Sequence, residues 1–254
     1  MSKVVLFIVE GERREVEIIN SMKSFLPEDT KIVSACVNIH MLYRIMKEYD
    51  FEADIITVLQ NMDGVSESDK EMLRSLDRVT YTYLIFDFDV QYYKLLSENN
   101  LELGFNAIYD MLSYFNNETD GTIGKMYINY PMVEAFRDCT DFFDNGYKDR
   151  VVELDELTGY KEIVGKRGIS TNISRWNYDD YLKLIDMNLY KANYLVNRRW
   201  IRPSYNEYIE SIGQINIMNS EKDSVIIDRQ VSVMCCIYLV IVDYIGKRLW
   251  NMMQ

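Results

Sequence analysis

Two aspartates separated by one residue, Asp87 and Asp89, are the side chains of this sequence best placed to do chemistry. They follow residues 81–86, a run of aromatic, aliphatic and β-branched residues that predicts a strand buried on both faces, as in a parallel sheet. Side chains alternate along a strand, so both carboxylates should point the same way, at the sheet edge where open α/β folds bind ligands. Two such carboxylates repel each other unless a cation or a proton lies between them. A polar strand end at a turn would give the same short pattern.

A second acidic strand end is expected near the start of the chain. Residues 4–9 are apolar and end in Glu10-Gly11-Glu12, and apolar residues then recur at helical spacing until Pro27. This pattern predicts a strand, a tight glycine turn and a helix. Glu10 would lie at the carboxyl end of the strand, with Glu15 in the first helical turn, where the helix dipole by itself favours an anion.

The same alternation of strand and helix continues along the chain. Further strands are expected at 31–37 and 125–129, and helices at 40–49, at 51–76 with a break near Asp63-Gly64, and at 92–115 with breaks near 99–100 and Gly104. Pro131 fits the first position of a helix, which places Glu134 one turn in. Connection rules then predict an α/β fold with a parallel sheet flanked by helices.

Composition narrows the possible chemistry. Hydrophobic residues make up 48% of the chain and charged residues 27%, as in ordinary globular proteins. His40 is the only histidine, and no segment around it resembles a nucleophile elbow, so it is expected as a helix-start or core residue and a Ser-His-Asp triad is excluded. The four cysteines show no C-x-x-C pairing, which argues against structural zinc and for reduced thiols in a cytoplasmic protein. No secretory signal pattern is expected at the N-terminus. With one histidine and no cysteine spacing suited to zinc, any catalysis should rest on carboxylates, lysines and a hard metal ion.

The charge of −12 is unevenly distributed. Residues 1–150 carry 15 Lys and Arg against 27 Asp and Glu, whereas residues 151–254 carry 13 of each. An acidic surface is a poor phosphate-binding surface unless divalent cations are held among the carboxylates. The second part contains Arg198, Arg199 and Arg202 around Trp200, the best candidate for a nucleic-acid-binding patch, although these arginines could equally pair with local acids.

Three motifs in this order resemble a Toprim domain. They are V-E-G-x-x-x-E at residues 9–15, D-x-D at 87–89, and Y-P-M-V-E-A-F at 130–136. The resemblance covers residues 1–150 and is closest to the small standalone branch related to the OLD and RloB nucleases, which includes anti-phage defence effectors. It implies a Toprim (Rossmann-like) catalytic domain over 1–150, followed by a mainly helical region over 151–254 for dimerisation or for substrate or partner binding.

The resemblance implies a Mg²⁺ (or Mn²⁺) centre that cleaves phosphodiesters. By position, Glu10, Asp87 and Asp89 resemble its metal ligands, and Glu15 and Glu134 its additional ligands or their neighbours. Nucleases of this family usually also have a basic residue near the scissile phosphate, for which Lys166 and Arg167 are the candidates, with Lys166 taken as catalytic. Lys166 and Arg167 are also candidates for nucleic-acid binding, although ordinary solvated charges on a turn would look the same. Mg²⁺ prefers oxygen ligands and keeps several waters, so a few carboxylates suffice.

The chain departs from OLD proteins because it has no G-x-x-x-x-G-K-[S/T] segment. An ATPase, of the ABC type in this branch, would have to come from a separate partner. The expected substrate is RNA such as tRNA; a DNA endonuclease of the OLD/RloB type and a non-catalytic interaction subunit are the alternatives.

The last part of the chain predicts two long helices. Residues 177–196 have an amphipathic pattern, and residues 224–250 read as one helix that is apolar around most of its circumference. The apolar run at 234–242 is too short to span a membrane. A helix of that kind needs covering on both sides, which predicts a homodimer. Complete covering by helices from residues 178–212 of the same chain is the alternative.

Overall fold

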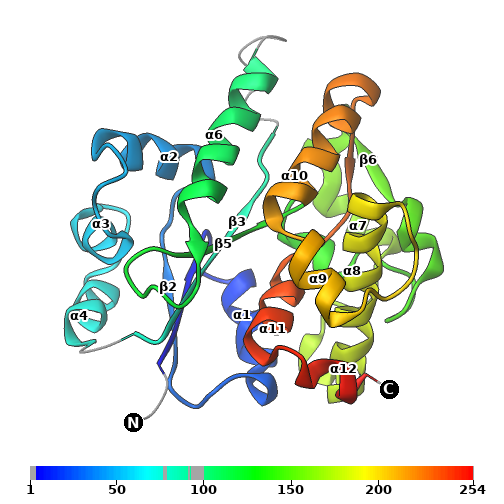
Figure 1. Cartoon of the computed structure of the whole chain (residues 1–254), viewed down its shortest axis with the longest axis horizontal. Helices are drawn as coiled ribbons and strands as arrows, with labels where there is room; N and C mark the ends of the chain where they lie inside the picture. The colour runs from blue at the N-terminus through cyan, green and yellow to red at the C-terminus, as the bar shows by residue number, and fades with distance from the viewer. Residues whose placement is uncertain (1–3, 77–78, 91, 93–99, 254) are drawn as a thin grey trace. The chain divides into compact units, whose positions relative to one another are not determined.

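The structure, a computed structural model, describes every residue except 1–3, 77–78, 91, 93–99 and 254. Helices flank a five-stranded sheet, which confirms the α/β fold class (Figure 1). Its strands are β1 (Val5–Val9), β2 (Thr30–Ser34), β3 (Tyr81–Asp87), β4 (Asn116–Asn117) and β5 (Gly124–Asn129), in the order β2-β1-β3-β5-β4. β1 pairs in parallel with β2 and with β3, whereas β4 pairs antiparallel with β5. The sheet is therefore mostly parallel.

The chain forms two compact units whose segments alternate in the sequence. The first unit contains Met1–Asp87 and Asn106–Tyr127, and the second contains Phe88–Phe105 and Ile128–Gln254. These limits differ from the expected division at residue 150. The chain leaves the first unit directly after β3, and it leaves that unit again within β5.

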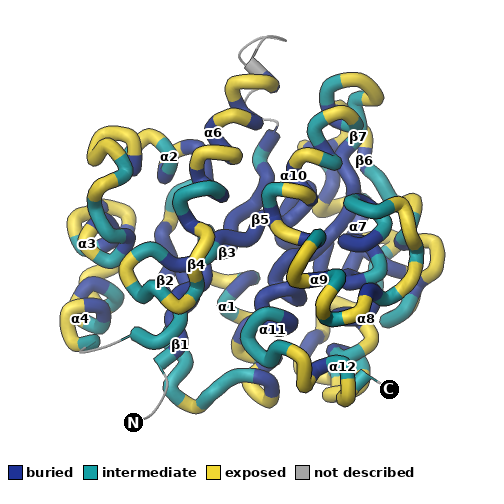
Figure 2. The backbone as a smooth tube through the Cα atoms, in the orientation of Figure 1, coloured by how far each residue is buried: buried dark blue, intermediate teal, exposed yellow. Residues whose placement is uncertain are grey.

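The strands at the centre of the sheet form the core of the first unit. Every residue of β1 is at most 1% exposed, and in β3 the side chains from Thr82 to Phe86 are all fully buried. Figure 2 shows these strands among the buried parts of the chain. The apolar runs that predicted buried strands in the sequence thus lie where a parallel sheet needs them.

The helical segments of the first unit are α1 (Arg14–Ser21), the 3₁₀ turn η1 (Lys23–Phe25), α2 (Ile39–Glu48), α3 (Ile55–Asn61) and α4 (Glu67–Ser75), while α6 (Asn100–Tyr114) runs from a segment of the second unit into the first. Side-chain caps begin α2, α3 and α4. The side chains of Asn38, Asp54 and Ser66 each accept a hydrogen bond from the backbone N–H three residues ahead. The predicted break near Asp63-Gly64 is confirmed. The predicted break at Gly104 is wrong, because α6 continues through it.

The second unit is mainly helical. Its elements are η2 (Val133–Arg137), η3 (Asn145–Asp149), β6 (Val151–Glu153), η4 (Leu154–Gly159), α7 (Tyr160–Arg167), η5 (Ile173–Arg175), α8 (Tyr178–Asn197), α9 (Tyr205–Ser211), α10 (Gln214–Asp223), the π-helical turn η6 (Ser224–Asp228), β7 (Gln230–Ser232), α11 (Ile237–Ile245) and α12 (Arg248–Met252). The long predicted helix α8 is confirmed, and it begins at a capping box in which Asn177 and Asp180 each accept a hydrogen bond from the other's backbone N–H.

The single helix predicted over residues 224–250 is wrong. Arg229 adopts a left-handed conformation with φ of 61°, which ends the helical turn η6. The next three residues form β7, which pairs antiparallel with β6. Helix resumes only at α11 and stops at Gly246, whose φ is 65°. Helical periodicity in this stretch therefore reflected general burial rather than one continuous helix.

The apolar residues of this stretch are covered within the chain itself. Every side chain from Val231 to Val242 is at most 5% exposed, and α11 packs against α8. The predicted homodimer rested on an uncovered apolar face, and that argument no longer holds. Among the described residues, no helix has both the length and the apolar composition needed to cross a bilayer.

Candidate active site in the first unit

The carboxyl ends of β1 and β3 converge on a pair of acidic residues. The two strands run parallel with Val9 opposite Ile85, so Glu10 comes directly after β1 while Asp87 closes β3. The backbone N–H of Asp87 donates a hydrogen bond to Oε2 of Glu10 at 3.1 Å. The Glu10 side chain therefore lies against the end of β3. The structure brings these two predicted metal ligands together.

Glu15 lies close to the same turn. It occupies the first turn of α1 and is 5% exposed. A Cβ atom built on Gly11 would stand 2.9 Å from Oε2 of Glu15, so the carboxylate rests against the glycine that follows Glu10. Gly11 thus allows the strand–turn–helix segment to place a third carboxylate beside the turn.

An open groove lies at the carboxyl ends of β1 and β2. It has a volume of about 370 Å³ and is lined by Glu10, Gly11, Glu12, Cys36, Val37 and Asn38. In open α/β sheets this is the edge at which ligands bind. The sequence reasoning missed Cys36 and Asn38, although their position after β2 matches that of Glu10 after β1. Burial and the Glu12 carboxylate raise the pKa of the Cys36 thiol, which makes Cys36 a weak nucleophile at neutral pH.

Asp89 does not continue the strand. β3 ends at Asp87, and Asp89 has a left-handed backbone with φ of 47°. The alternation that predicted a shared direction for the two aspartates therefore does not extend to Asp89. Asp89 belongs to the second unit, as does Phe88, whose ring packs against Tyr130.

Glu134 also belongs to the second unit. The helix expected from Pro131 is a 3₁₀ turn that begins at Val133. The Glu134 side chain is 9% exposed; its Oε1 pairs with Lys161 Nζ at 3.3 Å, and its Oε2 has no hydrogen-bond partner among the residues that the structure describes. A buried carboxylate oxygen without a partner is costly, so Glu134 is a candidate to bind a cation or a donor group.

The acidic residues fit a Mg²⁺ ion held weakly by a few carboxylates better than an ion surrounded by protein ligands alone. Within the described ranges, no three Asp, Glu, His or Cys side chains are grouped closely enough to hold a metal ion together. Mg²⁺ is commonly bound by one or two carboxylates, waters and substrate phosphates, which the adjacent Glu10 and Asp87 could supply. They do not form a site for an ion that needs an all-protein ligand shell.

The two basic residues predicted near the phosphate have different environments. Lys166 pairs with Glu162 at 2.8 Å on the surface, where both side chains are 75% exposed. Arg167 donates to both carboxylate oxygens of Asp138, at 2.7 and 2.6 Å, and Asp138 is fully buried. Arg167 is thus held in an ion pair within the second unit, whereas Lys166 is available to a ligand.

Two of the three clustered arginines also form ion pairs. Arg199 pairs with Glu207 at 2.7 Å, and Arg202 forms a two-pronged pair with Asp186 at 2.5 and 2.6 Å. Glu207 and Asp186 are thus local acids of the kind that the sequence analysis gave as alternative partners for these arginines. In the described part of the chain, no hydrogen bond or ion pair is found for the Arg198 guanidinium, and this residue is exposed at the C-terminal end of α8.

Cys36 lines the groove, whereas His40 and the other three cysteines are not among its lining residues. His40 is buried in α2, as expected of a core residue. The four cysteines are thiols that form no disulfide among the described residues, and three of them are buried. The ionisable groups that the described strand ends bring together are therefore mainly carboxylates, with the Cys36 thiol beside them.

Comparisons of the chain with protein-family models, with curated proteins and with solved structures found no match. Fold and site geometry therefore define the class: an α/β protein with a mostly parallel sheet and acidic strand ends.

Proposed function

We propose that the chain is a Mg²⁺-dependent Toprim-type nuclease that hydrolyses phosphodiester bonds in nucleic acid. The observation that carries this proposal is the hydrogen bond between the Asp87 backbone and the Glu10 carboxylate, because it brings two motif acids from neighbouring parallel strands together. The groove beside Glu10 supports it, since the groove opens at the sheet edge where α/β proteins bind substrates.

In this proposal Glu10 and Asp87 hold the metal ion, and the substrate phosphate completes its coordination. A bound Mg²⁺ would lower the pKa of a coordinated water and offset the charge that develops on the phosphate. Glu15, kept beside the turn by Gly11, would orient ligands or water. Asp89 and Glu134 remain proposed as further catalytic residues on the motif resemblance, and Lys166 as the basic residue that nucleases of this family usually have near the scissile phosphate.

Substrate and partners follow from the same resemblance. We propose RNA such as tRNA as the substrate, an ABC-type ATPase as a controlling partner, and a role as an effector in anti-phage defence. A DNA endonuclease is the alternative within the same chemistry. A non-catalytic binding subunit is the alternative outside it, and the lack of a group of three metal-binding side chains in the described ranges favours that second candidate.

The test is direct cleavage by the purified full-length chain. Total tRNA and supercoiled plasmid are incubated with the protein in MgCl₂, in MnCl₂ and in EDTA, with and without an ABC-type ATPase encoded beside it. We expect metal-dependent cleavage of tRNA that Glu10→Gln and Asp87→Asn each abolish. Glu17→Gln is the matched control, because Glu17 lies on the exposed side of the neighbouring helix and pairs with Arg14 at the surface.

Metal binding measured without substrate separates the candidates. Calorimetric titration with Mn²⁺ should show one weak site that both variants lose. Binding without cleavage of either nucleic acid, even with the ATPase, would support the non-catalytic subunit; unchanged cleavage in both variants would refute the site assignment.

A further inference from the structure

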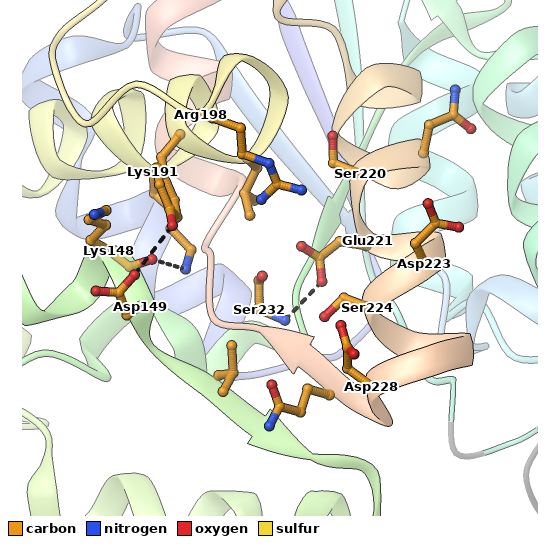
Figure 3. A pocket seen from close by; sticks show the side chains of 15 residues that line it. Lys148, Asp149, Lys191, Arg198, Ser220, Glu221, Asp223, Ser224, Asp228 and Ser232 are labelled. Carbon is orange, nitrogen blue, oxygen red and sulfur yellow. Dashed lines mark hydrogen bonds between the residues drawn. The ribbon is translucent and has the colours of Figure 1, made fainter.

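A second cavity lies entirely within the second unit, formed by α8, the end of α10, the π-helical turn η6, η3 and the strands β6 and β7. Its volume is about 330 Å³, at the small end of the range of roughly 300–1,000 Å³ for small-molecule sites. Figure 3 shows that charged side chains of both signs line it. π-Helical turns often mark functional sites, and η6 forms part of this wall.

One wall of the cavity is acidic and contains a buried oxygen without a partner. Glu221 is fully buried; its Oε2 accepts a hydrogen bond from the Ser232 backbone at 2.8 Å, while its Oε1 has no hydrogen-bond partner in the described part of the chain. In Figure 3 the unbonded oxygen faces the side of the cavity that carries Arg198 and Lys191. Asp228 adds a second carboxylate from η6. A buried acceptor left unpaired costs free energy that a ligand donor could recover.

The opposite wall is basic. Arg198 is exposed, and no ion pair or hydrogen bond of its guanidinium is found in the described part of the chain. Lys148 also faces the cavity, with its ammonium group 4.8 Å from the centre of the Tyr194 ring.

Lys191 supports the cavity without being available to a ligand. Its Nζ donates to the backbone carbonyls of Tyr147, Lys148 and Arg150, at 3.3, 2.8 and 3.1 Å. These three bonds use all three donors of an ammonium group. The cations left for an incoming ligand are therefore Arg198 and Lys148.

The charged side chains on the two walls together determine which charges a ligand must carry to bind. The lining contains the basic residues Lys148, Lys191 and Arg198 and the acidic residues Asp149, Glu221, Asp223 and Asp228, so it is close to balanced and slightly acidic. A polyphosphate would meet four carboxylates, and an apolar ligand would provide no partner for Glu221 Oε1 or for the Arg198 guanidinium. A molecule with one positive and one negative end satisfies both walls.

We propose that this cavity binds a small zwitterion, of which a free α-amino acid is the simplest, with its ammonium group at Glu221 and its carboxylate at Arg198. The ammonium would donate to Glu221 Oε1, with Asp228 nearby, and the carboxylate would accept from the Arg198 guanidinium. The site uses none of the residues of the proposed nuclease centre, and its test does not depend on nuclease activity.

The test is binding to the full-length chain. The twenty free L-amino acids are screened one at a time by thermal shift, with 5′-AMP and inorganic phosphate as separate arms, and hits are measured by calorimetry. We expect at least one amino acid to bind with a Kd below about 1 mM. Its N-acetyl and carboxamide derivatives, which each lack one charge, should lose binding.

Variants locate the site. Glu221→Gln and Arg198→Gln should each weaken binding of the best amino acid by at least about tenfold. Glu210→Gln and Arg175→Gln are the controls, since both residues are exposed and lie outside the cavity. Because Arg198 is on the surface, Arg198→Gln should fold, and its binding affinity tests the proposal even if Glu221→Gln fails to fold. No binding of any amino acid, binding of AMP or phosphate alone, or equal binding in Arg198→Gln would overturn the proposal.

Discussion

At the scale of single residues, Asp138 organises the buried charges of the second unit. Its carboxylate is fully buried and accepts hydrogen bonds from Arg167, from the Tyr160 hydroxyl at 2.9 Å and from Arg150 at 3.4 Å. A buried carboxylate is tolerated only when it is paired in this way. The main role of Arg167 is therefore structural, because it pairs with the buried Asp138; any part in ligand binding is additional to that role.

Arg167→Ala and Lys166→Ala should separate these two roles. Losing a partner of a buried charge costs about 3–5 kcal/mol, and we expect about 1–3 kcal/mol for Arg167 because its side chain is 37% exposed and two other partners remain. Lys166→Ala should change the unfolding free energy by less than about 0.5 kcal/mol, since its ion pair is exposed. Urea titrations followed by circular dichroism measure both. Equal losses would contradict the assignment.

Gly11→Ala tests the contact that positions Glu15. The added methyl group would stand 2.9 Å from Oε2 of Glu15, so the carboxylate must move. The far end of a side chain moves easily, and we expect a stability change of less than about 1 kcal/mol. Metal-dependent cleavage should nevertheless fall, because Glu15 leaves the turn. Gly165→Ala is the control, as no atom lies within 4 Å of a Cβ there; equal activity in both variants would remove Glu15 from the site.

The sequence predicted part of the candidate site for physical reasons. Apolar strands followed by acids locate Glu10 and Asp87, and parallel pairing brings such strand ends to one edge. The direction of Asp89 could not be predicted, because its left-handed backbone is a local choice that alternation does not encode. The ion pair between Arg167 and Asp138 could not be predicted either, because residues 29 positions apart in the sequence meet only through the tertiary fold.

At the scale of elements, Arg229 decides how the last part of the chain folds. Its left-handed φ of 61° ends η6, and β7 begins at the next residue. Non-glycine residues rarely adopt this conformation, and β-branched residues do so least. Nothing in the surrounding apolar pattern marks the turn, and the strand partner β6 lies far upstream, so periodicity alone predicted a continuous helix.

Substitutions at Arg229 should follow this backbone requirement. Arg229→Gly should leave stability unchanged or raise it by up to about 1 kcal/mol, because glycine adopts positive φ without steric cost. Arg229→Val should lose about 1–3 kcal/mol, because a β-branched side chain is strained there. Thermal unfolding of the three proteins makes the comparison. A valine variant as stable as the glycine variant would mean that the turn is not held in this conformation.

At the scale of the whole molecule, buried tyrosines control stability at alkaline pH. Burial raises the pKa of Tyr130, Tyr147, Tyr160 and Tyr238 well above the usual value near 10. Above pH 10 the unfolded chain loses these protons while the folded chain keeps them, so stability is intact below pH 10 and falls as the pH rises further.

Lys191 acts with the opposite sign at lower pH. Burial lowers its pKa to about 8, so between pH 8 and about 10.5 the unfolded chain holds more protons and stability rises. Because four tyrosines act against one lysine, the net fall in stability should begin near pH 10. Absorbance at 295 nm, recorded together with far-ultraviolet circular dichroism, follows this directly: at least four tyrosines should ionise only as the fold is lost. Ionisation of all twenty tyrosines in a folded chain would contradict their burial.

The oligomeric state depends on whether apolar surface remains uncovered. A dimer was expected from a helix that was apolar around its circumference, but the side chains from Val231 to Val242 are buried within the chain. The large apolar side chains that stay exposed, among them Ile209 and Ile227, are scattered along the sequence and carried by different elements. Single exposed apolar residues do not require a partner. We therefore expect a monomer of 30.1 kDa by light scattering at micromolar concentration. A particle of twice that mass would show that another surface forms a dimer, and Ile209→Asp and Ile227→Asp would then identify which of the two exposed residues lies in it.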